Sequence, residues 1–517
     1  MQHFQIVVVG SGFGGSITAM IAKKLGFSTA LIERGRHPRF VIGESSTPLT
    51  NLLLEEIAIQ YGLECLLPLC KWGRWQRELG RLPCGLKRGF SFYHHEFGRP
   101  FEPDPEHERQ LLVGASPNEE VADTHWYRPE FDRYLVDEAQ KLGIAYWDEV
   151  EIDRVVTGPD GIDLKGTRQG QSLELHGEFL IDATGPRGFL HRAFKLPEKP
   201  FATMPGTQAL FTHFTNVGPL PSSFSTKDKA PPFPPEQAAV HHVFDGGWVW
   251  VLKFNHGITS AGVVAEDRIA EKLQLRSGEG AWQKLLDCFP SLAEIFHEAR
   301  PTLPFRYQPR VAFQSAVMHG PRWALLPSAA GVIDPLLSTG FPLTLLGVLR
   351  LGQILELHWQ KPSFDAALNN YAGQSMAELE TTARLVAALY ASMNQFEVFT
   401  ELTLLYFAAA SFSETARRLD RHHLADSFLL CKNPKFSALL DECCRRASES
   451  PRGDKVQELR DLIRLGIEPI DVAGLSDSKR KNWFPAQTSD LLAAGQKLGA
   501  SRDDIIRMLA KCGLEVG

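Results

Sequence analysis

The chain has 517 residues, of which 44% are hydrophobic and 22% charged, and its formal net charge is −6. This length allows two or three domains with cores of ordinary size. The acidic balance argues against a nucleic-acid-binding protein. No uninterrupted apolar run reaches the roughly 18 residues that a membrane-spanning helix needs. We therefore expect no nucleic-acid partner and no transmembrane segment.

The eight cysteines are scattered and form no C-x-x-C pair, which is typical of reduced thiols in a cytoplasmic protein. The first expected strand starts close to Met1, so we expect no signal peptide. Histidines and cysteines do not recur at metal-ligand spacing, and the pairs His94-His95 and His241-His242 fit strand or loop positions better. The sequence therefore predicts a cytoplasmic protein without a bound metal.

The chain opens with an apolar, β-branched run, Gln5–Val9, that is typical of a strand buried on both faces. The pattern G-x-G-x-x-G follows directly, with glycines at positions 10, 12 and 15 around Phe13 and Gly14. Such glycines allow a tight turn, close approach of a pyrophosphate and close packing of a helix on the strand. This pattern predicts a phosphate-binding turn.

A helix over Ser16–Leu25 and a second strand over Ser28–Ile32 are expected next. The free N–H groups at the start of such a helix favour a phosphate. Glu33 ends the second strand, 18 residues after Gly15, where an acidic residue meets the ribose of an adenine dinucleotide. A glycine-rich turn without a ligand would explain the glycines but not Glu33. The opening therefore favours dinucleotide binding.

The next part of the chain continues this sheet. We expect a loop over Arg39–Pro48, a helix over Leu49–Ile59 and a strand around Phe90 and Phe92. A helix with an apolar face follows Arg128. Short strands over residues 145–184 end in an apolar strand, Glu178–Ala183, and a glycine turn at Gly185.

Residues 200–315 alternate in polarity, as in an antiparallel sheet, over Ala209–Thr215, His241–Phe254 and Thr259–Ala265. A surface loop is expected at 226–237. A buried strand at Trp323–Leu326 and a helix from Gly340 to Leu351 come next, and residues 363–517 read as almost wholly helical. We therefore predict an α/β protein with a Rossmann-like domain (1–199 and 316–360), an inserted antiparallel-sheet substrate domain (200–315) and a helical C-terminal region (361–517).

Four further segments carry a family resemblance. They read GESSTP (Gly43–Pro48), GLKRGFSF (Gly85–Phe92), GWVWVLKFNHGITSAGVV (Gly247–Val264) and SAAGVIDPLLSTGFPL (Ser328–Leu343). Together with the glycine turn they resemble motifs of the flavin-dependent halogenases, the tryptophan-halogenase-like family within the FAD-dependent monooxygenases. The resemblance runs from residue 1 to about residue 420, and it implies a glutathione-reductase-type FAD domain.

The resemblance also implies roles for individual residues. Lys87 matches the lysine that hydrogen-bonds hypohalous acid or becomes a haloamine. Ser338, Thr339 and Gly340 match the halide-binding S-T-G, and Trp248, Trp250 and Phe92 fall in the substrate pocket. FAD contacts fall on Gly10, Gly12, Phe13, Gly14, Gly15, Glu33, Arg34, Glu44, Ser45, Arg128, Gly185, Ser328, Gly331, Asp334 and Pro335.

The sequence departs from the family pattern at three places. Leu252-Lys253 stands where the family usually has Ile-Pro, after two tryptophans thought to suppress monooxygenation. Pro327-Ser328 replaces the usual Gly-Asp, so an acid near the ribityl chain is missing. Leu337 stands where tryptophan halogenases carry a glutamate, which favours a phenol or pyrrole over free tryptophan.

The function implied by the resemblance is FADH2-dependent halogenation of an electron-rich indole, phenol or pyrrole, with O2 and chloride or bromide. It proceeds through a flavin hydroperoxide and lysine-directed hypohalous acid. With one dinucleotide fingerprint in the sequence, we expect a separate flavin reductase to supply FADH2. The substrate could be tethered to a carrier, and a homodimer is compatible with the sequence. A monooxygenase that hydroxylates an aromatic or a protein side chain, and a non-catalytic flavin-binding interaction protein, remain alternatives.

Overall fold

The first sheet of the computed structural model carries the glycine turn; the structure describes residues 1–224 and 230–514. The central strands of this sheet run parallel. From one edge to the other, the strand order is β18 (His319–Gly320), β19 (Trp323–Leu325), β10 (Gln171–Asp182), β1 (Gln2–Val9), β2 (Thr29–Ile32) and β7 (Ala145–Trp147). β8 (Val150–Thr157) and β9 (Ile162–Arg168) extend β10 as antiparallel strands. This sheet is the predicted Rossmann-like βαβ arrangement.

The opening βαβ unit forms because its strands are apolar throughout and its turn is glycine-rich. All four residues of β2 and the last four of β1 are buried, as a parallel sheet covered on both faces requires. The helix between them, α1 (Phe13–Lys24), begins three residues earlier than predicted, inside the glycine pattern. The turn and the helix start are therefore one continuous feature.

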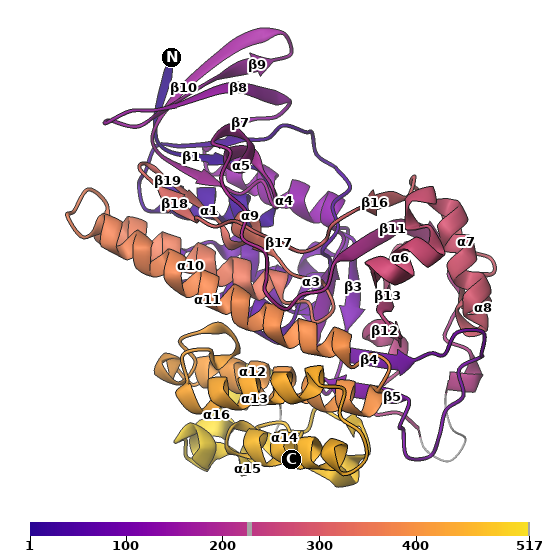
Figure 1. Ribbon diagram of the computed structural model, residues 1–517. Coiled ribbons are helices and arrows are strands. Elements are labelled where there is room, and N and C mark those ends of the chain that lie inside the picture. The colour runs from indigo at the N-terminus through magenta and orange to yellow at the C-terminus, as the bar shows by residue number, and fades with distance from the viewer. Residues whose placement is uncertain (225–229, 515–517) are drawn as a thin grey trace.

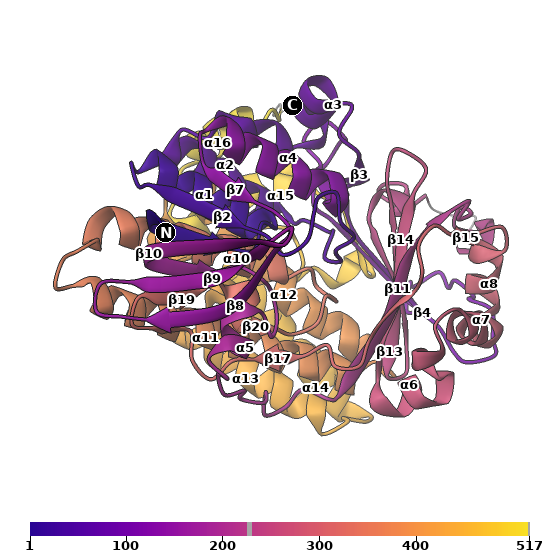
Figure 2. The same ribbon diagram turned by 90° about the horizontal axis from the view of Figure 1, so that it is seen from above.

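A second, larger sheet stands beside the first. Its strand order is β15 (Arg300–Pro301), β11 (Thr207–Thr215), β14 (Thr259–Glu266), β13 (Gly247–Lys253), β12 (Ala239–Phe244), β4 (Gly89–His94), β5 (Gln110–Gly114) and β21 (Trp483–Phe484). β16 (Arg306–Gln308) also pairs with β11. Its outer face carries α6 (Asp267–Leu273), α7 (Glu279–Cys288) and α8 (Pro290–Phe296) (Figure 2). The sheet therefore contains the expected strands of 200–315 and others from outside that range.

Strands from three parts of the chain complete the second sheet. β12 pairs in parallel with β4, and β21 pairs in parallel with β5. The expectation of an almost wholly helical region after residue 363 therefore misses β21, because two residues carry no periodicity. The expected loop at 226–237 lies partly outside the described residues.

Helices fill the space around both sheets. Their bounds are α2 (Pro48–Tyr61), α3 (Trp72–Leu79), α4 (Arg128–Lys141), α5 (Phe189–Ala193), α9 (Pro327–Ala330), α10 (Gly340–His358), α11 (Phe364–Ala391), α12 (Phe396–Arg418), α13 (Pro434–Ser448), α14 (Asp454–Ile467), α15 (Thr488–Ala493) and α16 (Arg502–Lys511). The orange helices α10 and α11 cross the molecule between the first sheet and the C-terminal helices (Figure 1). Two small pairs, β3 (Cys84–Lys87) with β6 (Asp123–Trp126) and β17 (Phe313–Gln314) with β20 (Gly331–Val332), lie apart from the large sheets.

One helix of the described chain, α10, has the length and apolar composition of a membrane-spanning helix. Its sequence is not an uninterrupted apolar run, because Arg350 and Glu356 lie within it. Of its apolar stretch, 72% is buried inside the protein, where α10 packs against α1 and α11. α10 is therefore accounted for as a core helix.

Candidate active site

The glycine turn presents an anion-binding surface. No acidic residue lies in the first turn of α1, and no side chain caps its free N–H groups. A Cβ on Gly12 would lie 3.5 Å from Nη2 of Arg128 and 3.7 Å from Nη2 of Arg39. Two guanidinium groups therefore face the N-terminus of the helix, an arrangement that suits a pyrophosphate.

Glu33, at the end of β2, is tied to this turn. Its Oε2 accepts hydrogen bonds of 3.0 Å from both N and Oγ of Ser11, and its Oε1 accepts one of 2.8 Å from N of Gly35. Burial works to raise the pKa of Glu33, but the Arg39 charge and these hydrogen bonds lower it overall. The carboxylate is therefore held ionised beside the turn, whereas the neighbouring Arg34 is exposed.

Arg128, at the start of α4, links the turn to the segment that follows β2. Its Nε and Nη2 each donate a 2.9 Å hydrogen bond to the carboxylate of Asp132, and Nη1 donates one of 2.9 Å to the carbonyl of Gly43. Its guanidinium also lies over the rings of Phe13 and Phe341. Because this cation is buried and paired, its position is fixed before any ligand arrives.

A cavity of about 410 Å³ lies between the two sheets and joins most of the predicted cofactor and halide residues. The predicted cofactor and halide residues that line it are Gly12, Phe13, Gly14, Glu44, Ser45, Arg128, Gly185, Ser328, Gly331, Asp334, Pro335, Ser338, Thr339 and Gly340. Trp248 and Trp250, predicted to line the substrate pocket, also line this cavity. The structure places Gly10, Gly15, Glu33, Arg34, Lys87 and Phe92 outside this lining. Gly10 and Gly15 lie beneath the turn, where a Cβ on Gly15 would come 1.8 Å from the Gly10 carbonyl oxygen.

A buried network connects two of the motifs at the cavity wall. The hydroxyl of Tyr390 donates a 2.9 Å hydrogen bond to Oδ2 of Asp334, and Nε1 of Trp248 donates one of 3.2 Å to the Tyr390 oxygen. Burial raises the pKa of Asp334 to about 7, against the lowering effect of Tyr390 and the Leu336 amide. The network fixes the Trp248 indole, and sequence reasoning missed Tyr390 because it lies far along the chain on α11.

The S-T-G segment sits at the N-terminus of α10. Ser338 adopts a φ of 55°, and the helix begins at Gly340 with no acidic residue in its first turn and no side-chain cap. Nothing lies within 4 Å of the position a Cβ on Gly340 would take, so the backbone there is open to the cavity. Free N–H groups at a helix start suit an anion such as a halide.

Lys87 is fully buried at the end of β3, between this cavity and a second one. Its Nζ donates hydrogen bonds of 2.8 Å to Oγ of Ser45 and 2.5 Å to the carbonyl of Ser46, and it lies 3.8 Å from the centre of the Phe90 ring. Ser45 lines the first cavity and Phe90 lines the second. The lysine lines neither cavity, but it contacts a residue in the wall of each.

Charged and titratable groups surround Lys87. Asp123 stands directly opposite it in the antiparallel pair of β3 and β6, and the Asp123 Oδ1 accepts a 2.8 Å hydrogen bond from Asn51. Burial lowers the pKa of Lys87 and raises that of Asp123, and the charge of each partner opposes the other's shift. Burial and then the Lys87 charge lower the pKa of both His125 and His241, so both rings are neutral at pH 7.

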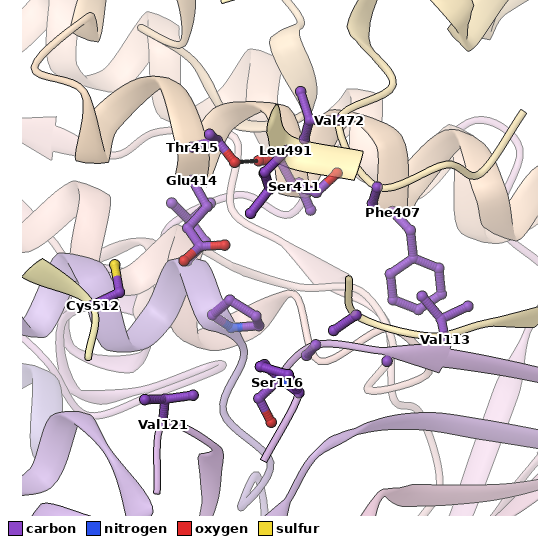
Figure 3. A pocket seen from close by; sticks show the side chains of 18 of the residues that line it. Val113, Ser116, Val121, Phe407, Ser411, Glu414, Thr415, Val472, Leu491 and Cys512 are labelled. Atoms are coloured by element: carbon purple, nitrogen blue, oxygen red, sulfur yellow. Dashed lines mark hydrogen bonds between the residues drawn. The ribbon is translucent and has the colours of Figure 1, made fainter. Parts of the chain in front are cut away.

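The second cavity measures about 180 Å³ and lies against the C-terminal region. Figure 3 shows its walls: Val113 from β5 and Ser116 just after it, Glu414 from α12, and Cys512 from the last part of the chain. Phe92, predicted to line the substrate pocket, lines neither cavity; it stacks on His241 with ring centres 4.6 Å apart. Sequence reasoning did not single out Asp123 or Glu414, because no local motif marks them.

The residues present fit an FAD. The glycine turn, Arg39 and Arg128 would suit its pyrophosphate, and Glu33, after the end of β2, would suit its ribose. The larger cavity extends from this turn to the S-T-G segment. Ser328 lines the cavity where the family usually has an acid, so a hydroxyl is available at that place. The site therefore has the polar groups that a dinucleotide requires.

The sequence model of the tryptophan halogenase family matches residues 124–399, more than half of the chain. The chain therefore belongs to this family, and it is an FAD-dependent oxidoreductase of the flavin-dependent halogenase type, which uses FADH2, O2 and a halide.

Individual relatives agree with this assignment. The chain is 30% identical over 405 residues to monodechloroaminopyrrolnitrin halogenase PrnC of Pseudomonas fluorescens, a match that covers 77% of this chain and 70% of that one. It is 29% identical over 349 residues to tetracycline 7-halogenase of Kitasatospora aureofaciens, covering 66% of this chain and 61% of the relative. The solved structure of halogenase PltM with phloroglucinol and FAD superposes with a TM-score of 0.79 at 22% identity, covering 92% of this chain and 99% of that one, and supports the fold.

Proposed function

We propose that this protein halogenates an electron-rich aromatic ring held in the 180 Å³ cavity, with Lys87 delivering the halogen from the larger cavity. The single observation that carries the proposal is the position of Lys87, whose Nζ contacts one residue of each cavity wall. A residue that transfers the halogen from the site of oxidation to the aromatic acceptor must lie between the two sites. Reduced FAD, when bound with O2 and a halide, supplies hypohalous acid.

The protein's own residues then position the cofactor and the halide and keep the hypohalous acid away from solvent. The glycine turn, Glu33 and Arg128 hold the cofactor, and the start of α10 holds the halide. Lys87 hydrogen-bonds the hypohalous acid or takes the halogen on its neutral amine. In the first case the ring carbon takes the halogen, and the hydroxide of the acid leaves as water with the ring proton. In the second case the hydroxide leaves as water with a proton of the amine, and the ring proton returns to the amine when the halogen passes to the ring carbon. The walls keep the hypohalous acid from bulk solvent, because Lys87 itself is buried.

The two sheets have different functions in this proposal, cofactor binding and acceptor binding. The first sheet with α1 and α10 acts as the FAD domain, and the second sheet with the C-terminal helices encloses the acceptor. A separate flavin reductase supplies FADH2, since the sequence has one dinucleotide fingerprint. The eight cysteines are free, which suits the cytoplasm, where thiols stay reduced. Among the relatives, one is a chlorinase of pyrrole-2-carbonyl on a peptidyl carrier protein, so we extend the proposal to free or carrier-tethered rings.

The test is a mass-spectrometric assay with FAD, NADH, an added flavin reductase and a panel of phenols, arylamines, indoles and pyrroles, run with and without bromide. We expect a bromide-dependent product that falls by about two orders of magnitude or more in Lys87→Met. The same reaction with monochlorodimedone as a free scavenger of hypohalous acid shows whether the oxidising half is intact in that variant.

Two outcomes would contradict the proposal. An unchanged yield in Lys87→Met would remove the lysine from the reaction. A mass gain of one oxygen without any need for bromide would make the protein a hydroxylase; Leu252, which lines the FAD cavity where the family usually has isoleucine, would then be the first residue to revert.

A further inference from the structure

The second cavity has the dimensions of one substituted aromatic ring. Its volume is about 180 Å³, and an apolar protein cavity of roughly 150 Å³ accepts benzene. Phe90, Val113 and Phe407 supply apolar surface for the ring faces. A polar group in such a wall decides how the ring is oriented, because apolar contacts alone permit several rotations.

Most polar groups of α12 at this cavity are already committed to the protein. Oγ1 of Thr415 donates a 2.8 Å hydrogen bond to the carbonyl of Ser411, and Oγ of Ser411 donates one of 3.2 Å to the carbonyl of Ala408. Nζ of Lys71 donates a 2.9 Å hydrogen bond to the carbonyl of Cys512. These groups satisfy backbone carbonyls and offer little to a ligand.

Glu414 is different. Its Oε1 accepts a 2.6 Å hydrogen bond from Nε of Arg418, and within residues 1–224 and 230–514 no hydrogen bond to its Oε2 is present. Figure 3 shows the side chain directed from α12 toward the middle of the cavity. Arg418 also lies 3.5 Å from a carboxylate oxygen of Glu55, so it is shared between two acids. A carboxylate with a free oxygen and a partly shared cation is a strong hydrogen-bond acceptor.

Glu414 also belongs to the neighbourhood of Lys87. Burial raises the pKa of Asp123 against the Lys87 charge, and the Glu414 carboxylate adds to this rise. The carboxylate therefore lies within electrostatic reach of the lysine pair. A ring held between Glu414 and Phe90 would lie next to the residue that Lys87 contacts, since Nζ of Lys87 is 3.8 Å from the centre of the Phe90 ring.

We propose that Glu414 is the residue that recognises the acceptor, and that the acceptor is a ring bearing an O–H or N–H donor, which Glu414 binds through its free carboxylate oxygen. The inference rests on the proposed function and names its substrate class. Accepting this hydrogen bond pushes electron density into the ring, which favours attack on the halogen at positions ortho and para to the donor. Glu414 lies on α12, far along the chain from the position before S-T-G, where tryptophan halogenases carry a glutamate and this chain has Leu337.

The test compares resorcinol with 1,3-dimethoxybenzene, in which a methyl ether replaces each O–H donor, in binding to the FAD-loaded protein by isothermal titration calorimetry. In Glu414→Met, resorcinol should bind about tenfold more weakly or worse, because a hydrogen bond to a charged group is lost. The affinity for 1,3-dimethoxybenzene should stay within about threefold. Glu397→Met, the same substitution on the same helix at a side chain that is 56% exposed and outside the cavity lining, should leave both affinities unchanged.

Glu414→Gln keeps an acceptor oxygen and guards against misfolding of the Met variant; resorcinol should lose less affinity in it than in Glu414→Met. Equal losses for both rings, no loss for either, or no binding of either ring to the unaltered protein would overturn the inference. Binding of resorcinol in Lys87→Met separates this result from the proposed function. If that variant and the unaltered protein bind resorcinol equally but neither yields a halogenated product, the acceptor site stands and the halogenation proposal fails.

Discussion

The ion pair between Arg128 and Asp132 gives the sharpest stability prediction. The two side chains are 6% and 0% exposed and meet through two hydrogen bonds of 2.9 Å. Arg128→Leu would leave the Asp132 charge buried without its partner, which costs about 3–5 kcal/mol. The lost hydrogen bond to the Gly43 carbonyl adds about 1 kcal/mol. We therefore expect FAD-free Arg128→Leu to unfold at clearly lower urea concentration than the parent protein.

Two further variants make this result specific. Arg128→Leu combined with Asp132→Asn should recover most of the lost stability, because the buried charge is gone. Arg133→Leu removes a pair one turn along the same helix, with Asp137, that is 53% exposed on both sides; it should cost at most about 0.5 kcal/mol.

FAD binding separates the two roles of Arg128. Fluorescence titration should show weaker FAD binding in both the single and the double variant, since each lacks the guanidinium that faces Gly12. The reasoning is refuted if Arg128→Leu is as stable as Arg133→Leu, or if the double variant is no more stable than the single one.

Other predictions concern the lysine pair and the glycines. Asp123→Asn should move the ionisation of Lys87 in the pH profile of kcat/KM for ring halogenation to lower pH, because the Asp123 charge raises the pKa of that lysine; an unmoved profile would contradict the pairing. Gly15→Ala should abolish FAD retention on gel filtration, since its Cβ would lie 1.8 Å from the Gly10 carbonyl oxygen. Gly373→Ala, in α11 with nothing within 4 Å, should keep FAD and raise thermal stability by up to about 1 kcal/mol; equal FAD retention in the two variants would refute the steric argument.

Sequence patterns correctly predicted the secondary-structure elements that are determined by residues close together in the chain. The opening strand, the glycine turn and the helix after it are encoded within some thirty neighbouring residues, so periodicity and glycine positions suffice. Helix and strand ends differ from expectation by a few residues, as with α10, which continues from the expected end at Leu351 to His358. Most of the residues that the family motifs predict to contact FAD line one cavity in the structure.

Features made by long-range pairing could not be read from the sequence. Asp123 faces Lys87 only because β3 and β6 pair in a particular register, 36 residues apart in the chain. Glu414 reaches the second cavity only because α12 packs against β4, where Phe407 meets Phe90. Neither contact leaves a periodic signal in the sequence, since it depends on how separate elements dock rather than on the residues beside them.

The pairing of β21 with β5, Phe484 against Val113, bears on how the protein is made. The larger cavity is lined by residues no later than Leu379, whereas the second also needs residues as far as Leu514. During synthesis from the N-terminus, the residues that line the larger cavity are therefore made before those that complete the wall of the second one. The C-terminal region therefore determines whether the second cavity is enclosed, whereas the described residues after Leu379 add none to the lining of the larger cavity.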